Sequence, residues 1–172
     1  MSQTVLVRYG AISDVARFRV AASGPIDRGA RVVIRSPRGV EVGTLLDAVV
    51  SSDPDSNGAE EFDLRVLRRS TADDEARLAE LRGRAEADFA AWRRRIEEWN
   101  LKLELIDLEW MLEDDKLVLY VLNDRGPDCT KLALQAAAAG LGIIEVQPVG
   151  AEGLMTLESN GGCGSGGCGN CS

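Results

Sequence analysis

Three cysteines lie close together near the end of the sequence, and their type and spacing could support metal chemistry. Cys163, Cys168 and Cys171 fall within nine residues and are interleaved with glycines. Cys168 and Cys171 form a C-x-x-C, a spacing that is used to ligate both zinc and iron–sulfur clusters. Thiolate donors favour iron–sulfur clusters, zinc or cuprous copper over magnesium or calcium. The tail therefore predicts a thiolate metal site, with an iron–sulfur cluster or zinc as the cofactor.

Three thiolates leave one coordination position open. Cys129, the other cysteine of the chain, could complete the site, and a partner protein could equally supply the fourth ligand. Two simpler interpretations stay open: Cys129 is a small core residue at the start of an apolar helix, and the glycine-rich tail is a flexible end whose thiols do nothing specific. A catalytic C-x-x-C is disfavoured, because that motif normally sits at a helix N-terminus that stabilises the thiolate.

The absence of histidine narrows the possible reactions. With no histidine in 172 residues, Ser-His-Asp and Cys-His catalysis and an imidazole general base are all excluded. The adjacent acids Glu113, Asp114 and Asp115 are best explained as turn residues. We therefore expect a protein that is not an enzyme and has no small-molecule substrate.

Charge is distributed unevenly along the chain. The net charge of −8 argues against a general nucleic-acid coat protein, which would carry a basic surface. The first fifty residues nevertheless hold seven arginines against four acidic residues, a balance of +3, which leaves −11 for the remainder. Arg31, Arg35 and Arg38 lie on one predicted hairpin and are candidate contacts for single-stranded RNA. The alternative is an arginine-rich barrel surface that is simply solvated.

The two ends of the chain and its apolar runs bear on localisation. The first residues show no basic segment followed by an apolar run, so no signal peptide is predicted. The longest apolar run is too short to span a bilayer. We expect a cytoplasmic protein, in which clustered cysteines indicate metal or redox chemistry rather than structural disulfides.

The pattern of short apolar runs predicts an α+β protein in three parts. Residues 1–60 contain several short strands with tight glycine and proline turns, including a hairpin over 31–46, which is typical of a small β-barrel. Residues 61–150 follow the order β-α-β-β-α-β, the split βαβ pattern of a ferredoxin-like sandwich with one long helix. Residues 151–172 form the flexible glycine- and cysteine-rich tail.

The long helix is predicted from a stripe of apolar residues that recurs every three or four positions between 78 and 99. Ser70 or Thr71 is expected to cap its first turn, and Asn100 to end it in a left-handed conformation. The stripe either packs on the protein's own sheet or extends beyond it to dock a partner helix.

Several segments resemble the RicT/YaaT family, whose members carry the PSP-one C-terminal domain. The resemblance is carried by segments in the family's order and spacing across most of residues 5–149: 29–33, 38–44, 65–74, 99–109, 116–121, 127–128 and 142–146. It implies a non-enzymatic adaptor that assembles with two small helical subunits into a complex holding 4Fe–4S clusters. Such a complex modulates messenger-RNA processing by an endoribonuclease.

The cysteine region shares only part of the family's motif. Gly161-Gly162 and Cys168-Gly169 correspond to it, whereas the adjacent cysteine pair of the family is absent here. The alternative function is an RNA-binding module with a zinc- or other metal-binding cysteine tail.

Overall fold

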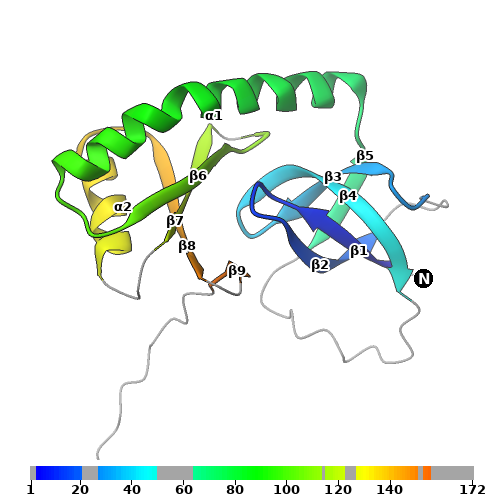
Figure 1. Ribbon diagram of the computed structural model, residues 1–172. Helices are drawn as coiled ribbons and strands as arrows, with labels where there is room; N and C mark the ends of the chain where they lie inside the picture. Colours follow the sequence, from blue (N-terminus) through cyan, green and yellow to red (C-terminus); the bar gives the residue numbers. More distant parts are fainter. Residues whose placement is uncertain are drawn as a thin grey trace, which may run out of the picture.

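The computed structural model describes residues 3–20, 27–49, 64–113, 115–122, 127–150 and 153–155. Within these ranges the chain is an α+β protein in which a closed barrel and a second sheet lie side by side beneath one long helix (Figure 1). None of the helices in the described ranges has the length and apolar character needed to cross a bilayer.

Five strands form the barrel. They are hydrogen-bonded in the closed order β1-β2-β5-β3-β4, with these bounds: β1 Gln3–Tyr9, β2 Asp14–Val20, β3 Arg31–Ser36, β4 Gly39–Val49 and β5 Arg65–Arg69. Alternate side chains of each strand point inward, as the period of two requires, and they fill the interior with Val5, Val7, Phe18, Val32, Ile34, Leu45 and Val66. Closure leaves the barrel without an exposed edge.

The second sheet has the order β6-β7-β8-β9, with β6 Glu104–Trp110, β7 Lys116–Leu122, β8 Ile143–Gly150 and β9 Gly153–Leu154. Helix α2, Asp128–Ala138, makes the crossover between the parallel strands β7 and β8. One face of the sheet packs against both helices, with a core that includes Leu117, Leu119, Val121, Trp92, Ile96 and Leu132.

The long helix α1, Ala72–Glu98, extends over both units. A reciprocal capping box begins it: the Thr71 hydroxyl accepts from the Asp74 N–H, and the Asp74 carboxylate accepts from the Thr71 N–H. After the helix, Asn100 takes a left-handed φ of 54°. Both end signals are therefore confirmed, with Thr71 as the N-cap.

The apolar stripe of α1 packs within this chain. At 1.5 Å per residue, 27 residues span about 40 Å, long enough to cover both units. Leu78 contacts a small cluster on the barrel, whereas Trp92 and Ile96 are buried on the second sheet. The interpretation in which the stripe covers its own sheets is thus supported.

The α+β class, the N-terminal barrel and the order of elements are confirmed, and one strand pairing is corrected. Strand β5 does not join the second sheet as a ferredoxin-like arrangement requires. It pairs in parallel with β2 and antiparallel with β3, because these two strands would otherwise leave open edges and the barrel would not close. The barrel therefore includes a strand from beyond residue 60.

Candidate nucleic-acid interface

Three arginines form a row across adjacent barrel strands. In the β2–β5 pairing Arg19 is opposite Arg65, and in the β3–β5 pairing Arg65 is opposite Arg35. All three side chains are exposed, as is Arg17, two residues before Arg19 on the same side of β2. We call Arg17, Arg19, Arg35 and Arg65 the arginine face.

Like charges at directly opposed positions of neighbouring strands oppose pairing of the strands. An anionic ligand bound across the row would reduce this repulsion and accept charge-assisted hydrogen bonds from the guanidinium groups. Proteins that bind single-stranded nucleic acid use positively charged surfaces of this kind to follow the phosphate backbone. The arginine face therefore has the chemistry of a phosphate-backbone contact.

Of the three arginines expected from the sequence, the structure places only Arg35 on this face. Arg31 also points outward from β3, but α1 begins over that part of the strand. Its guanidinium pairs with Glu75, with an Nε–Oε1 distance of 3.2 Å, and donates to the Thr44 hydroxyl at 3.1 Å. Arg31 thus lies between the barrel and the first turn of α1.

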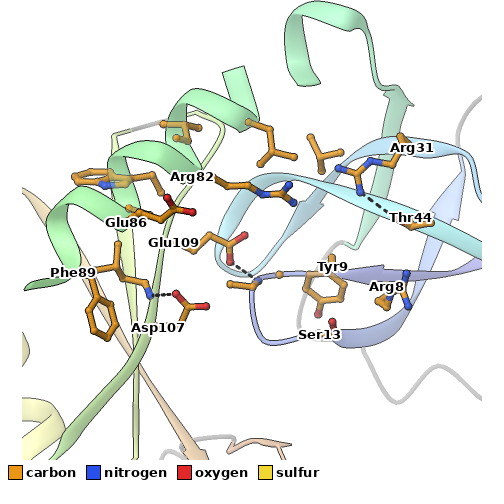
Figure 2. A pocket seen from close by; sticks show the side chains of 18 residues that line it. Arg8, Tyr9, Ser13, Arg31, Thr44, Arg82, Glu86, Phe89, Asp107 and Glu109 are labelled. Carbon is orange, nitrogen blue, oxygen red and sulfur yellow. Dashed lines mark hydrogen bonds between the residues drawn. The ribbon is translucent and has the colours of Figure 1, made fainter. Parts of the chain in front are cut away.

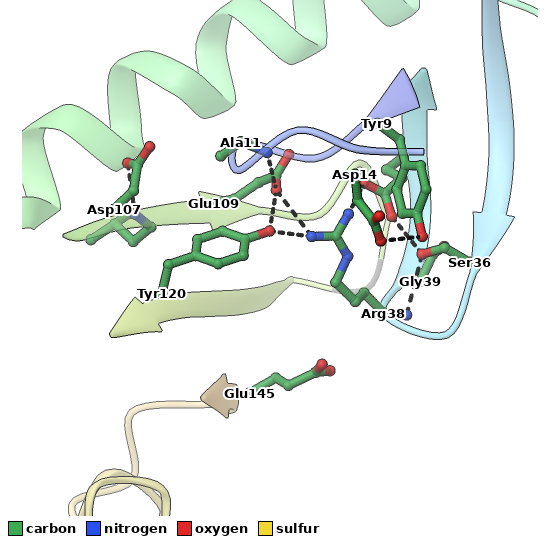
Figure 3. Close-up of polar contacts among 12 residues, drawn as sticks. Tyr9, Ala11, Asp14, Ser36, Arg38, Gly39, Asp107, Glu109, Tyr120 and Glu145 are labelled. Carbon is green, nitrogen blue, oxygen red and sulfur yellow. Dashed lines mark hydrogen bonds and ion pairs between the residues drawn. The ribbon is translucent and has the colours of Figure 1, made fainter. Parts of the chain in front are cut away.

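The expectation that Arg38 faces solvent as a contact for RNA is wrong. It is only 6% exposed, and it connects the barrel to the second sheet rather than facing solvent. Its Nη2 lies 2.7 Å from Glu41 Oε2, its Nη1 donates to the Tyr120 hydroxyl, and it pairs with Glu109 at 3.9 Å (Figure 3). A side chain in the turn between β3 and β4 would ordinarily be solvated, but β6 and β7 pack directly on this turn.

The Arg38 cluster, comprising Arg38, Glu41, Glu109 and Tyr120, is a fully bonded polar contact between the two units. Tyr120 donates to Glu109 at 2.8 Å, and the Ala11 N–H donates to the same carboxylate oxygen at 3.0 Å. No buried side-chain nitrogen or oxygen in the described ranges lacks a partner. Since buried charges are tolerated only when paired and hydrogen-bonded, the cluster fixes how the barrel sits against the sheet.

Burial also changes the titration of this cluster. It raises the pKa of the Glu41 carboxyl to about 7, with Arg38 opposing the shift and the Glu109 charge adding to it. Burial likewise raises the pKa of the Tyr120 hydroxyl, which keeps it protonated as a donor to Glu109.

The metal ligands expected from the sequence divide into two groups. Cys163, Cys168 and Cys171 lie outside the described residues. Cys129 is described: it is 7% exposed and packs in the core beneath the two helices. No group of three or more histidine, cysteine, aspartate or glutamate side chains suited to a metal ion occurs within the described part of the chain.

The prediction that Cys129 is a fourth metal ligand stays a prediction, because the other three cysteines lie outside the described residues. Cys129 belongs to α2 and is part of the buried cluster between the helices and the sheet. Its position supports the alternative interpretation of a small core residue.

Sequence reasoning missed three members of the arginine face. Arg17 and Arg19 alternate with Ala16, Phe18 and Val20, so the period of two along β2 does predict that they point outward together. Arg65 carries no such signal, because its place between β2 and β3 depends on a pairing between strands far apart in the sequence.

These features define an α+β protein built from a β-barrel with an arginine face, joined to a sheet covered by two helices. Residues 64–137, from just before β5 to the last turn of α2, match the PSP1 C-terminal conserved region. No curated protein and no solved structure matches the chain.

Proposed function

We propose that this protein is a non-enzymatic adaptor that binds RNA through the arginine face and acts in the cytoplasm in a complex that modulates RNA processing by an endoribonuclease. The observation that carries the RNA contact is the register of Arg19, Arg65 and Arg35 on three adjacent strands. The PSP1 region and the resemblance to the RicT/YaaT family support the setting. In that setting the partners are small helical subunits and the endoribonuclease.

RNA binding is tested by fluorescence anisotropy with a labelled single-stranded RNA over a range of salt concentrations. Neutralised phosphates release counterions, with a slope of log K against log salt of about −0.7 per phosphate for single strands. The triple variant Arg19→Glu, Arg35→Glu, Arg65→Glu should weaken binding at low salt and flatten the slope by about 2.

A matched control reverses three exposed arginines of α1, namely Arg77, Arg93 and Arg94. This variant has the same net charge as the first but leaves the barrel unchanged. If both variants lost affinity equally, binding would depend on total charge and the arginine face would not be the interface. If neither lost affinity, RNA binding through the barrel would be refuted.

We further propose that Cys163, Cys168 and Cys171 hold an iron–sulfur cluster or zinc, with the fourth ligand supplied by a partner protein. The clustering of three thiols and the C-x-x-C spacing support this proposal.

The cofactor is tested by metal and sulfide analysis of the anaerobically purified full chain and of a chain ending at residue 160. A broad absorbance near ~400 nm with iron and sulfide would support a cluster; colourless protein with stoichiometric zinc would support zinc. Equal metal content in both chains would refute a site in the tail. Cys129→Ser should leave metal content unchanged, and a loss of metal would reinstate Cys129 as a ligand.

A further inference from the structure

A cleft of about 690 Å³ lies between the barrel, α1 and β6 (Figure 2). Its size is within the usual range of small-molecule sites, about 300–1,000 Å³. It is separate from the arginine face: that face lies on β2, β5 and the far end of β3, whereas the cleft is bounded on the barrel side by β1, β4 and the start of β3.

One end of the cleft is basic. Across β1, β4 and β3, Thr44 is the register partner of Arg8 on one side and of Arg31 on the other. Arg82 extends from α1 toward this row. Three guanidinium groups and one hydroxyl from three strands and a helix therefore face a common space.

The basic end is partly preorganised. Two hydrogen bonds to Glu75 and one to Thr44 hold the Arg31 guanidinium in place. Because the Thr44 oxygen accepts from Arg31, its own O–H is available to donate. Within the described residues, Arg8 and Arg82 make no direct hydrogen bond or ion pair, although the charge of Arg82 helps to lower the pKa of the Glu75 carboxyl. Both guanidinium groups can therefore turn to a ligand without breaking a direct contact.

The other end of the cleft is acidic. Glu86 lies one turn beyond Arg82 on α1, and Asp107 and Glu109 come from β6. Glu109 is already engaged by Tyr120 and Arg38, which leaves Glu86 and Asp107 as the acceptors offered to a ligand. Between the two ends, the wall of α1 is apolar and includes Leu78, Leu81, Ala85 and Phe89.

The ligand must match this polarity. A phosphate suits the basic end, since guanidinium groups bind phosphate oxygens through paired hydrogen bonds. Carboxylates at the opposite end accept from amino groups, as they do from the exocyclic amine of cytosine. The distance along α1 from Leu78 to Phe89 is about 16 Å at 1.5 Å per residue, which accommodates one nucleotide.

We propose that this cleft binds a nucleoside phosphate, with the phosphate at Arg8, Arg31 and Arg82 and an amino-bearing base at Glu86 and Asp107. The bound unit is a free nucleotide or the phosphorylated end of an RNA strand, which share this chemistry. The proposal does not depend on the arginine face, whose residues are different.

Isothermal titration of the full chain with guanosine monophosphate, guanosine and uridine monophosphate tests the site. The expected order is guanosine monophosphate over uridine monophosphate, which has no exocyclic amine, with guanosine weakest because it has no phosphate. Arg82→Ala and Arg8→Ala should each weaken guanosine monophosphate binding about tenfold or more, the usual effect of losing a charge-assisted hydrogen bond. Glu86→Gln combined with Asp107→Asn should remove the preference over uridine monophosphate.

Arg94→Ala is the matched control, because Arg94 is exposed on the same helix but pairs with Glu98 outside the cleft. It should bind like the unaltered chain. No binding of any nucleotide at millimolar concentration would overturn the proposal. Equal loss of affinity in Arg82→Ala and Arg94→Ala would overturn it too, as would identical affinities for guanosine and its monophosphate.

The two sources of the ligand are separated on the Arg19→Glu, Arg35→Glu, Arg65→Glu background, in which binding through the arginine face is removed. A 5′-phosphorylated RNA that binds more tightly than its 5′-hydroxyl counterpart, with the difference lost on adding Arg82→Ala, identifies an RNA end. Binding of the free nucleotide with no such difference between the RNAs identifies a nucleotide. Failure of the arginine face alone would leave nucleotide binding intact, so the two proposals fail separately.

Discussion

Replacing Glu41 with glutamine should remove a pH dependence of stability that originates in the Arg38 cluster. Glu41 is 3% exposed and lies within hydrogen-bonding distance of Arg38 and Ser36. Two carboxylates, Glu41 and Glu109, share the one guanidinium of this cluster. Burial and the second carboxylate outweigh the pairing with Arg38, so the pKa of Glu41 rises from 4.5 to about 7.

The sign and size of the effect follow from this pKa. Since the folded-state pKa is above the unfolded value, the folded protein binds more protons between pH 4.5 and 7, and its stability falls as pH rises through this range. The contribution is fully present below pH 4.5 and absent above about pH 7. At 1.36 kcal/mol per pKa unit, it amounts to about 3 kcal/mol.

Urea unfolding of the unaltered chain and of Glu41→Gln, from pH 4.5 to 8, measures this contribution. Glutamine stays neutral, so the free energy of unfolding of the variant should rise relative to the unaltered chain by about 3 kcal/mol over that range. Titrations shared by both proteins cancel in the difference. If instead the unaltered chain gained relative to the variant as pH rose, Glu41 would be ionised throughout, and the pairing with Arg38 would outweigh burial.

Asp74→Asn provides a contrast of opposite sign. The Asp74 carboxylate accepts hydrogen bonds from Arg68 and Thr71, and these hold its pKa below the ordinary value of 3.8. The stability it contributes is therefore present above that value and lost as pH falls. The difference between the unaltered chain and this variant should change only below about pH 4.

Three further substitutions test how the fold is assembled, each by urea unfolding at pH 7. Arg38→Met should cost about 3–5 kcal/mol, because it leaves the buried Glu41 and the half-buried Glu109 without their cation; a loss below 1 kcal/mol would contradict this role. Gly10→Ala should cost more than the roughly 1–2 kcal/mol that a left-handed backbone conformation costs a residue with a Cβ. Gly10 has a φ of +79°, and the added Cβ would also lie 2.5 Å from the Arg38 guanidinium. An unchanged stability would refute this close packing. Thr71→Ala should cost about 1 kcal/mol by removing the N-cap of α1, and Thr71→Ser should retain most of the stability.

The sequence was most informative where structure is decided by near neighbours. The limits of α1 follow from Thr71 and Asn100, whose effects act within a turn of the chain. The alternation in β1 and β2 likewise reflects which side of each strand is buried. These local signals predicted the α+β class, the N-terminal barrel and the order of the elements.

Pairings between distant segments could not be predicted in the same way. The pattern β-α-β-β-α-β is compatible with β5 in either sheet. The sequence of a strand of only five residues does not determine which strands it pairs with. Its place in the barrel depends on the open edges of β2 and β3, and these arise only when the barrel assembles.

The same reason explains which candidate site residues were identified. Arg38 lies in a Pro-Arg-Gly turn, where an exposed side chain is the normal expectation, and its burial depends on Tyr120 and Glu109 from the second sheet. Arg35 was predicted to be exposed and is exposed, because Ile34 points into the barrel and the period of two along β3 turns Arg35 outward.

Helix α1 divides the outward surface of β3 between the two proposed ligand sites. Arg31 and Arg35 are four residues apart and point to the same side of one strand, yet α1 encloses the first in the cleft and leaves the second on the arginine face. Both positions are on the strand that leads into the turn holding Arg38. The cluster that fixes the barrel on the sheet therefore also fixes the geometry of the cleft, which both units line. Arg38→Met should consequently weaken nucleotide binding in the cleft, which is built by both units, more than RNA binding by the arginine face, which belongs to the barrel alone.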